Sequence, residues 1–171
     1  MKKILIAMIL LLTGCISVPK NIKPVDNFQI ERYLGKWYEI ARLDHSFERG
    51  LSSVNAEYSL RPDGGINVIN RGFSSRDNKW KEIEGKGSFV DHNDVGFLKV
   101  SFFGPFYGSY VVFDLDRDNY SYALVCGPDK SYLWLLARSP QMDDNLKKRL
   151  VDKAASLGFD TTKLIYVQHN H

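Results

Sequence analysis

The residues that could carry out chemistry in this chain are two cysteines and four histidines. Cys126 would act as a nucleophile only if the fold brought a base such as Glu39 or a tyrosine to it. The histidines are distant from it in the sequence, and the chain has no Gly-x-Ser-x-Gly, His-Glu-x-x-His or Cys-x-x-Cys motif. We therefore interpret Cys126 as a buried, inert thiol, and we expect no catalytic residue, no metal site and no cofactor.

Cys15 has a different chemistry, because it ends a leader-like segment. Met1-Lys2-Lys3 is positively charged, and the apolar run from Ile4 to Leu12 is too short for a bilayer span of about 20 residues. This pattern fits a secretory signal. Leu12-Thr13-Gly14-Cys15 resembles the bacterial lipobox, which is cut before its cysteine. The resemblance implies a signal peptide at 1–14 and lipid attachment at Cys15, where several acyl chains would hold the protein stably on a membrane.

Residues 15–26 contain Pro19 and Pro24 and show no hydrophobic periodicity, so we interpret them as a lipidated tether to a folded domain at 27–171. Ile16, and not an aspartate, follows the cysteine. By resemblance to lipoprotein sorting rules, this favours the outer membrane, with the domain facing the periplasm.

The composition is ordinary for a soluble globular domain, with 44% hydrophobic and 25% charged residues. The formal net charge is +3, and Lys2 and Lys3 in the expected signal supply two of these charges. The remaining chain is nearly neutral, which predicts no nucleic-acid partner.

The stretch from Gly35 to Arg42 reads Gly-Lys-Trp-Tyr-Glu-Ile-Ala-Arg. Side chains on a strand alternate between faces, so Trp37, Glu39 and Ala41 are expected to share one face. This stretch resembles the Gly-x-Trp signature that opens the first strand of lipocalins. Over about residues 27–168 the chain is similar to bacterial lipocalins and, more distantly, to apolipoprotein D.

A second resemblance concerns Leu136-Ala137-Arg138, which matches a late lipocalin motif. In the family, this arginine lies across the tryptophan of the first strand. The resemblance therefore assigns Gly35, Trp37 and Arg138 to closure of one end of the barrel, as structural residues.

The family fold is an all-β, eight-stranded antiparallel up-and-down barrel with one C-terminal helix packed on its outside. The turn pattern agrees, because turns recur about every dozen residues with no helix between strands. The apolar stripe after Met142-Asp143-Asp144 predicts the helix, and Gly158 ends it. The expected strands are about 35–42, 53–60, 66–73, 80–90, 98–102, 109–116, 120–127 and 131–138.

If Trp37 points inward, the alternation of side chains along the strands predicts which residues line the interior cavity. Such a wall is mostly apolar and aromatic, which suits a hydrocarbon tail, and its tyrosines could bond an ester or carboxyl oxygen. The alternative is a dry core, since side chains can fill a barrel of eight strands. The expected lining residues are Glu39, Ala41, Val54, Ala56, Tyr58, Ile83, Leu98, Val100, Phe102, Tyr110, Val112, Tyr132, Trp134 and Leu136.

At the open end, opposite Trp37, the loops carry an apolar rim of Phe47, Leu51, Phe103, Phe106 and Tyr107. An exposed apolar cluster indicates contact with a membrane or with a second protomer in a homodimer. The same residues could instead fold inward as a lid.

These observations predict a non-catalytic binding protein for fatty acids, lysophospholipids or similar amphipaths, which stores or transports lipid for outer-membrane maintenance. Its partners would be a small hydrophobic ligand and the membrane, reached through Cys15. Three alternatives stay open at this stage. They are a lipid-modifying isomerase or hydrolase in the same cavity, a binder of haem or another small hydrophobic molecule, and a purely structural envelope protein.

Overall fold

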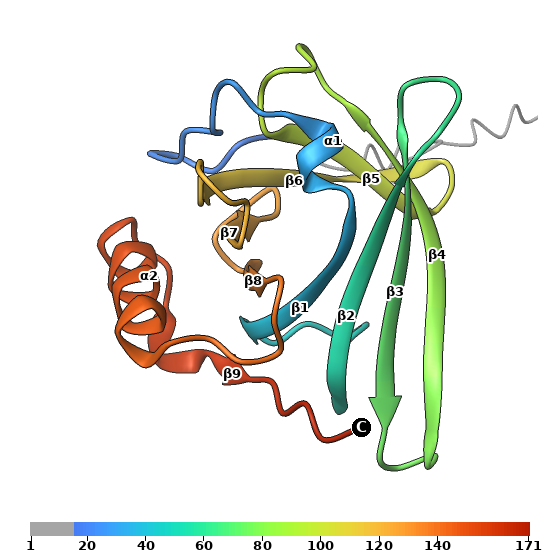
Figure 1. Ribbon diagram of the computed structural model, residues 1–171, viewed down its shortest axis with the longest axis vertical. Coiled ribbons are helices and arrows are strands. Elements are labelled where there is room, and N and C mark those ends of the chain that lie inside the picture. Colours follow the sequence, from blue (N-terminus) through green and yellow to red (C-terminus); the bar gives the residue numbers. More distant parts are fainter. Residues whose placement is uncertain (1–15) are drawn as a thin grey trace, which may run out of the picture.

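The computed structural model describes residues 16–171, so the expected signal peptide at 1–14 and the lipid site at Cys15 lie outside the described residues. Its strands form one antiparallel sheet that closes on itself where β1 pairs with β2, and this confirms the predicted barrel (Figure 1). The elements are α1 (Ile30–Tyr33), β1 (Gly35–Arg42), β2 (Leu51–Leu60), β3 (Ile66–Ser74), β4 (Lys79–Phe89), β5 (Phe97–Phe103), β6 (Phe106–Leu115), β7 (Tyr122–Cys126), β8 (Leu133–Ala137), α2 (Asp144–Ser156), a short 3₁₀ turn (Thr161–Lys163) and β9 (Ile165–Tyr166).

Helix α2 lies outside the barrel, as predicted (Figure 1). It begins after Asp143, whose carboxylate accepts a hydrogen bond from the Leu146 N–H at 3.0 Å. Its buried residues Leu150 and Ala154 pack against the outer faces of β6, β7 and β8. No helix within residues 16–171 is long and apolar enough to cross a membrane.

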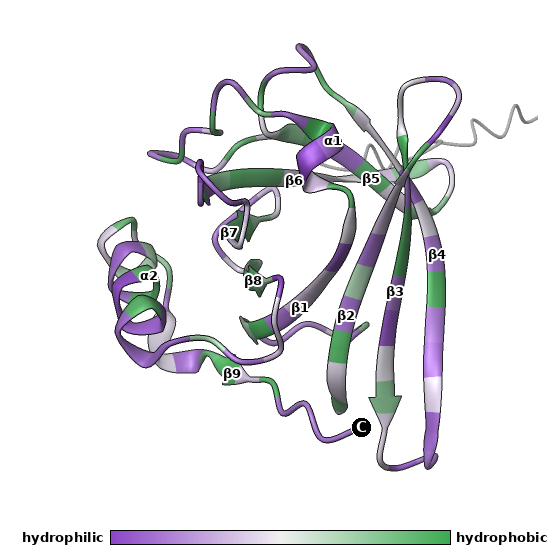
Figure 2. Cartoon of the chain, viewed as in Figure 1, coloured by the Kyte–Doolittle hydropathy of each residue, from purple (hydrophilic) through white to green (hydrophobic). Residues whose placement is uncertain are grey.

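The barrel wall separates two hydrophobic clusters. The inner cluster fills the interior around Trp37, and the outer cluster lies between the wall and α2. Figure 2 shows the sequence basis, because hydrophilic and hydrophobic bands alternate along β2, β3 and β4. A strand that separates an apolar interior from solvent requires this alternation.

One end of the barrel is closed by Trp37, which is fully buried. Its indole Nε1 donates to the Tyr33 carbonyl at 2.8 Å, and the Arg138 guanidinium lies 4.0 Å from the ring centroid. Such a stacked cation contributes about 0.5–2 kcal/mol. Arg138 also donates to the Arg32 and Lys36 carbonyls at 2.7 and 2.9 Å, so it joins α1 to the start of β1.

Strand β1 contains a register shift between Glu39 and Ala41, where it pairs with β8. The extra residue, Ile40, reverses the alternation of faces. Ala41 therefore packs in the outer cluster, and Arg42 turns toward the interior. The prediction that Ala41 lines the interior is wrong, because a strict strand period does not allow for a bulge.

Residues 16–26, expected to form a free tether, instead contact the barrel. The Val25 N–H donates to the Val112 carbonyl at 2.9 Å, and the Val25 carbonyl accepts from the Gly96 N–H at 2.8 Å. The side chains of Ile22 and Val25 are both buried. Burial of this apolar surface holds the segment against the wall, and the two prolines do not prevent it.

The chain end after β9 bridges β1 and β2, where the two strands no longer pair directly. The Ser53 N–H of β2 donates to the Gln168 carbonyl at 2.7 Å, and His169 Nε2 lies 2.9 Å from the Glu39 carbonyl oxygen of β1. Figure 1 shows this segment passing from β9 toward the ends of β2 and β3. It completes the wall that the bulged strands leave open.

Candidate functional site

The interior of the barrel is the candidate site, and most of the expected lining residues face it. The expected residues that belong to the inner cluster or pack against it are Ala56, Tyr58, Leu98, Val100, Phe102, Tyr110, Val112, Trp134 and Leu136. Of the other expected residues, Val54 is buried, and Ile83 is half-buried beside Asn70 in the β3–β4 pair.

In the half of the interior near Trp37, three tyrosines bond one another. The Tyr110 hydroxyl lies 2.8 Å from that of Tyr33 and 2.9 Å from that of Tyr58. Burial raises the pKa of all three hydroxyls above the usual value, so they stay neutral. Tyr58 and Tyr110, expected to meet ligand oxygens, therefore already have partners at the closed end.

The other half of the interior holds buried charges. We call Glu39, Arg42, His45, Glu48 and Trp134 the mouth cluster. Arg42 is 1% exposed and Glu39 is 3% exposed. Arg42 Nη1 donates to Glu39 Oε1 at 2.8 Å, and Arg42 Nη2 donates to the Glu48 carbonyl at 2.9 Å. The bond to the Glu48 carbonyl attaches the loop at 43–50 to β1.

One oxygen of Glu48 lies at the centre of the mouth cluster. Glu48 Oε2 accepts from Trp134 Nε1 at 3.2 Å, and it lies 2.9 Å from His45 Nε2 and 3.9 Å from Arg42 Nε. The His45 ring also packs between Phe47 and Trp134, with centroids 4.0 and 5.2 Å away. The loop is therefore fixed over the barrel mouth by polar and aromatic contacts together.

The pKa values of the two carboxyl groups of the mouth cluster shift in opposite directions. Burial raises the pKa of Glu39 well above its usual range, the Glu48 carboxylate raises it further, and Arg42 offsets only part of this. Burial also acts to raise the pKa of Glu48, but contacts with His45, Trp134 and Glu39 outweigh it, so its pKa is lowered. Glu39 therefore keeps its proton to a higher pH than Glu48 does.

The remaining expected residues lie at the same end. The Tyr132 ring is 6.1 Å from both His45 and Trp134. Of the expected rim, Phe47, Phe103 and Phe106 are exposed, with 58, 70 and 50% of their surface accessible. Leu51 and Tyr107 are half-buried. Contact of this rim with a membrane or with a second protomer stays a prediction.

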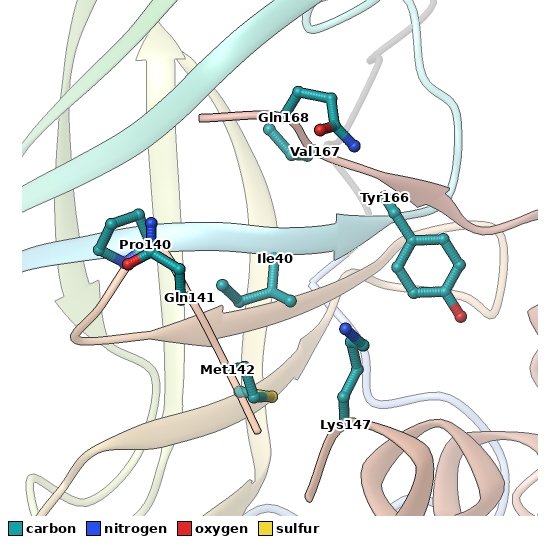
Figure 3. Close-up of a pocket in the computed structure, with 8 residues that line it drawn as sticks. All are labelled: Ile40, Pro140, Gln141, Met142, Lys147, Tyr166, Val167 and Gln168. Carbon is teal, nitrogen blue, oxygen red and sulfur yellow. The ribbon is translucent and has the colours of Figure 1, made fainter. Parts of the chain in front are cut away.

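Two of the pockets that residues 16–171 form open on the outer surface. One of about 240 Å³ is lined by residues of β1, β9 and the segment before α2, including Ile40, Met142 and Tyr166 (Figure 3). The other, of about 350 Å³, lies beside His169 and His171 at the chain end. Neither pocket contains a residue expected to line the interior, so the cavity itself stays a prediction.

Cys126 is separated from the interior carboxyl groups. It lies in the outer cluster, whereas Glu39 faces inward, so the wall stands between the proposed nucleophile and its base. Burial raises the pKa of the Cys126 thiol to about 12, which leaves almost no thiolate at neutral pH. Within the described part of the chain, no three His, Cys, Asp or Glu residues are arranged to hold a metal ion.

The sequence-based interpretation missed Arg42, His45 and Glu48. In a regular strand, Arg42 would point away from the face that Trp37 and Glu39 share, and His45 follows the strand in a loop, so neither is expected inside the barrel. The available signal was the density of charge in the short run from Arg42 to Arg49. That run does not show which of its charges become buried, because this depends on how the loop folds against β8.

A closed eight-stranded barrel with an external helix, a Trp–Arg closure and a polar mouth defines a barrel of the small-molecule binding type. Residues 28–169 match the family model described as a Lipocalin-like domain. The chain belongs to the lipocalin family.

Known relatives agree with this assignment. The chain is 60% identical over 158 residues to Outer membrane lipoprotein Blc of Vibrio cholerae, which covers 92% of each chain. It is 30% identical to apolipoprotein D of Mus musculus, over 81% of this chain and 76% of the relative. Insecticyanin from the tobacco hornworm Manduca sexta has the same fold, with a TM-score of 0.69 and 24% identity over 89% of this chain and 86% of that one. The relatives named outer membrane lipoprotein confirm the predicted outer-membrane location.

Proposed function

We propose that this protein is a carrier of single-chain amphipaths, such as fatty acids or lysophospholipids, at the outer membrane. The observation that supports this most directly is the division of the interior into an apolar, aromatic part and the charged mouth cluster. A hydrocarbon chain suits the first part and a polar headgroup the second. Family membership supports a binding role, and the separation of Cys126 from Glu39 argues against nucleophilic catalysis.

The proposal includes an anchor at Cys15, a periplasmic orientation, and a role in storing or moving lipid for outer-membrane maintenance. The lipobox-like Leu12-Thr13-Gly14-Cys15 supports the anchor. Relatives with the name outer membrane lipoprotein support the location in which such a carrier would work.

The test has two parts. The protein is purified without detergent, and its bound lipids are extracted and identified by mass spectrometry. The delipidated protein is then titrated with oleate by calorimetry, and we expect one saturable site with a dissociation constant of about 1 µM or lower, or about −8 kcal/mol. Absence of both co-purified and titrated amphipath would contradict the carrier function.

A further inference from the structure

The carboxylate of Glu48 lies in a site made of nitrogen donors. Trp134 Nε1 and His45 Nε2 lie 3.2 and 2.9 Å from Glu48 Oε2, and Arg42 Nε lies 3.9 Å away. Arg42 Nε is buried and has no hydrogen-bond partner among the described residues. The Trp134 N–H donor and a guanidinium 3.9 Å from the same oxygen form the kind of site that receives a carboxylate. Here the carboxylate that occupies it comes from the protein itself.

Two of these donors belong to the barrel wall and stay in place if the loop moves. Arg42 of β1 and Trp134 of β8 are direct partners in the strand register. Glu48 and His45 belong to the loop at 43–50, which forms no regular strand or α-helix. Movement of this loop would therefore remove the acceptor and leave Arg42 and Trp134 without it.

The charge balance determines what can replace Glu48. Arg42 is 1% exposed and has two carboxyl groups beside it, with Glu39 Oε1 at 2.8 Å and Glu48 Oε2 at 3.9 Å. Removal of a charge partner from a buried cation is strongly unfavourable. An incoming carboxylate restores the balance when Glu48 leaves, whereas an uncharged alcohol does not.

We propose that Glu48 is an internal substitute for the ligand headgroup, and that a single-chain carboxylate binds by displacing it from Arg42 and Trp134 and moving the loop at 43–50 away from the mouth. This inference rests on the proposed carrier function and adds its headgroup class and its gate. Arg42 becomes the residue that determines specificity for the headgroup. The loop residue Phe47, already 58% exposed, moves together with Glu48.

The first experiment compares two ligands that differ only in the headgroup, oleate and oleyl alcohol, by calorimetry on the delipidated protein. We expect oleate to bind at least about tenfold more tightly, as loss of a charge-assisted hydrogen bond predicts. Arg42→Gln should weaken oleate binding by about tenfold and leave oleyl alcohol unchanged. Arg76→Gln, at an exposed turn between β3 and β4, serves as the matched control.

The second experiment tests the displacement itself. Glu48→Gln removes the competing charge but keeps the shape, so oleate should bind about tenfold more tightly while oleyl alcohol does not change. Glu84→Gln, on the exposed face of β4, is the control. Hydrogen exchange of the amides at 43–50 should rise when oleate binds and should not rise with oleyl alcohol.

The outcomes separate this inference from the carrier function. Oleate and oleyl alcohol binding equally well, with no effect of Glu48→Gln, would overturn the headgroup inference and leave the carrier intact. If neither ligand binds, the carrier function fails, and this inference fails with it. Should Arg42→Gln not fold, Trp134→Phe keeps an aromatic ring at this position, removes one donor and is expected to weaken oleate binding alone.

Discussion

Arg42 is a cation that the fold has removed almost completely from water, and its neighbours explain how this is tolerated. Glu39 and the Glu48 carbonyl accept its hydrogen bonds, and the Glu48 carboxylate lies 3.9 Å from its Nε. A buried ion pair adds little net stability, but removal of one partner costs about 3–5 kcal/mol. The mouth cluster is therefore better explained by ligand binding than by stabilisation of the barrel.

Glu39→Gln tests the raised pKa of Glu39 in the mouth cluster. The pKa of Glu39 is raised in the folded protein, so the unfolded chain loses this proton first, and folding is progressively disfavoured as pH rises above the usual range of a glutamate. Glutamine resembles the protonated acid and does not titrate. We expect the melting temperature of the variant to exceed that of the wild type by an amount that grows between pH 5 and pH 8.

Thermal unfolding monitored by circular dichroism gives this difference, with about 2–4 °C expected for each 1 kcal/mol in a domain of this size. Glu84→Gln, at an exposed position, should show no such trend. If the difference in melting temperature between variant and wild type stays constant from pH 5 to pH 8, Glu39 is ionised in the folded protein throughout this range. Glu48 behaves oppositely, because its lowered pKa makes its contribution disappear as pH falls.

At the scale of elements, two irregular strands explain the arrangement of the mouth. A bulge in β1 near Ile40 turns Arg42 inward, and a second register shift in β2 lies between Ser52 and Asn55. Ser53 has a φ of +51°, which an ordinary strand does not allow. Direct pairing between β1 and β2 ends at Tyr38 and Asn55, and the chain end fills the gap that follows. The bulges therefore explain both the buried charge and the need for a bridge.

Removal of residues 168–171 tests this bridge. The truncation deletes the Gln168 and His169 contacts to β2 and β1 and the His171 ring that stacks 3.9 Å from Phe73. We expect the free energy of unfolding to fall by about 1–3 kcal/mol, since each hydrogen bond contributes about 0.5–1.5 kcal/mol. The amide of Ser53, which donates to Gln168, should exchange faster.

The amide of Val112, bonded to Gly96 far from the chain end, is the internal reference and should keep its protection. Unchanged exchange at Ser53 in a folded truncation variant would mean that β1 and β2 close the wall without the bridge.

For the whole molecule, the packing of residues 16–26 changes the expected position relative to a membrane. A free tether of about ten residues could reach ~35 Å. In the structure, the Ser17 N–H instead donates to Ser109 Oγ at 2.8 Å, and Ile22 and Val25 are buried. If Cys15 carries lipid, the barrel therefore lies close to the lipid surface.

Cys15→Ser tests the anchor. The serine cannot form the thioether, so we expect the protein to move from the membrane fraction to the soluble fraction of the cell envelope while the barrel stays folded. Fractionation with immunodetection, together with the intact mass, measures this. A variant that stays in the membrane fraction without any lipid mass would show that another part of the chain, such as the exposed Phe103 and Phe106, is sufficient for attachment.

The barrel and its helix could be predicted because their signals are local. Alternation along β2, the turns between strands and the stripe on α2 depend only on neighbouring residues, and the resemblance around Trp37 and Arg138 supplied the topology. The site could be predicted only in part. Tyr58, Leu98 and Trp134 follow the strand period, whereas Ala41 does not, because one inserted residue reverses the pattern after Glu39.

Local sequence thus determined which segments become strands, and the resemblance around Trp37 indicated that the tryptophan closes one end of the barrel. Tertiary structure alone decided that Arg42, His45 and Glu48 meet inside the barrel, that residues 16–26 contact its wall, and that the chain end bridges β1 and β2. These features depend on contacts between segments distant in sequence. Their free energy comes from burial and hydrogen bonding in the closed fold, which the periodicity of a single strand does not contain.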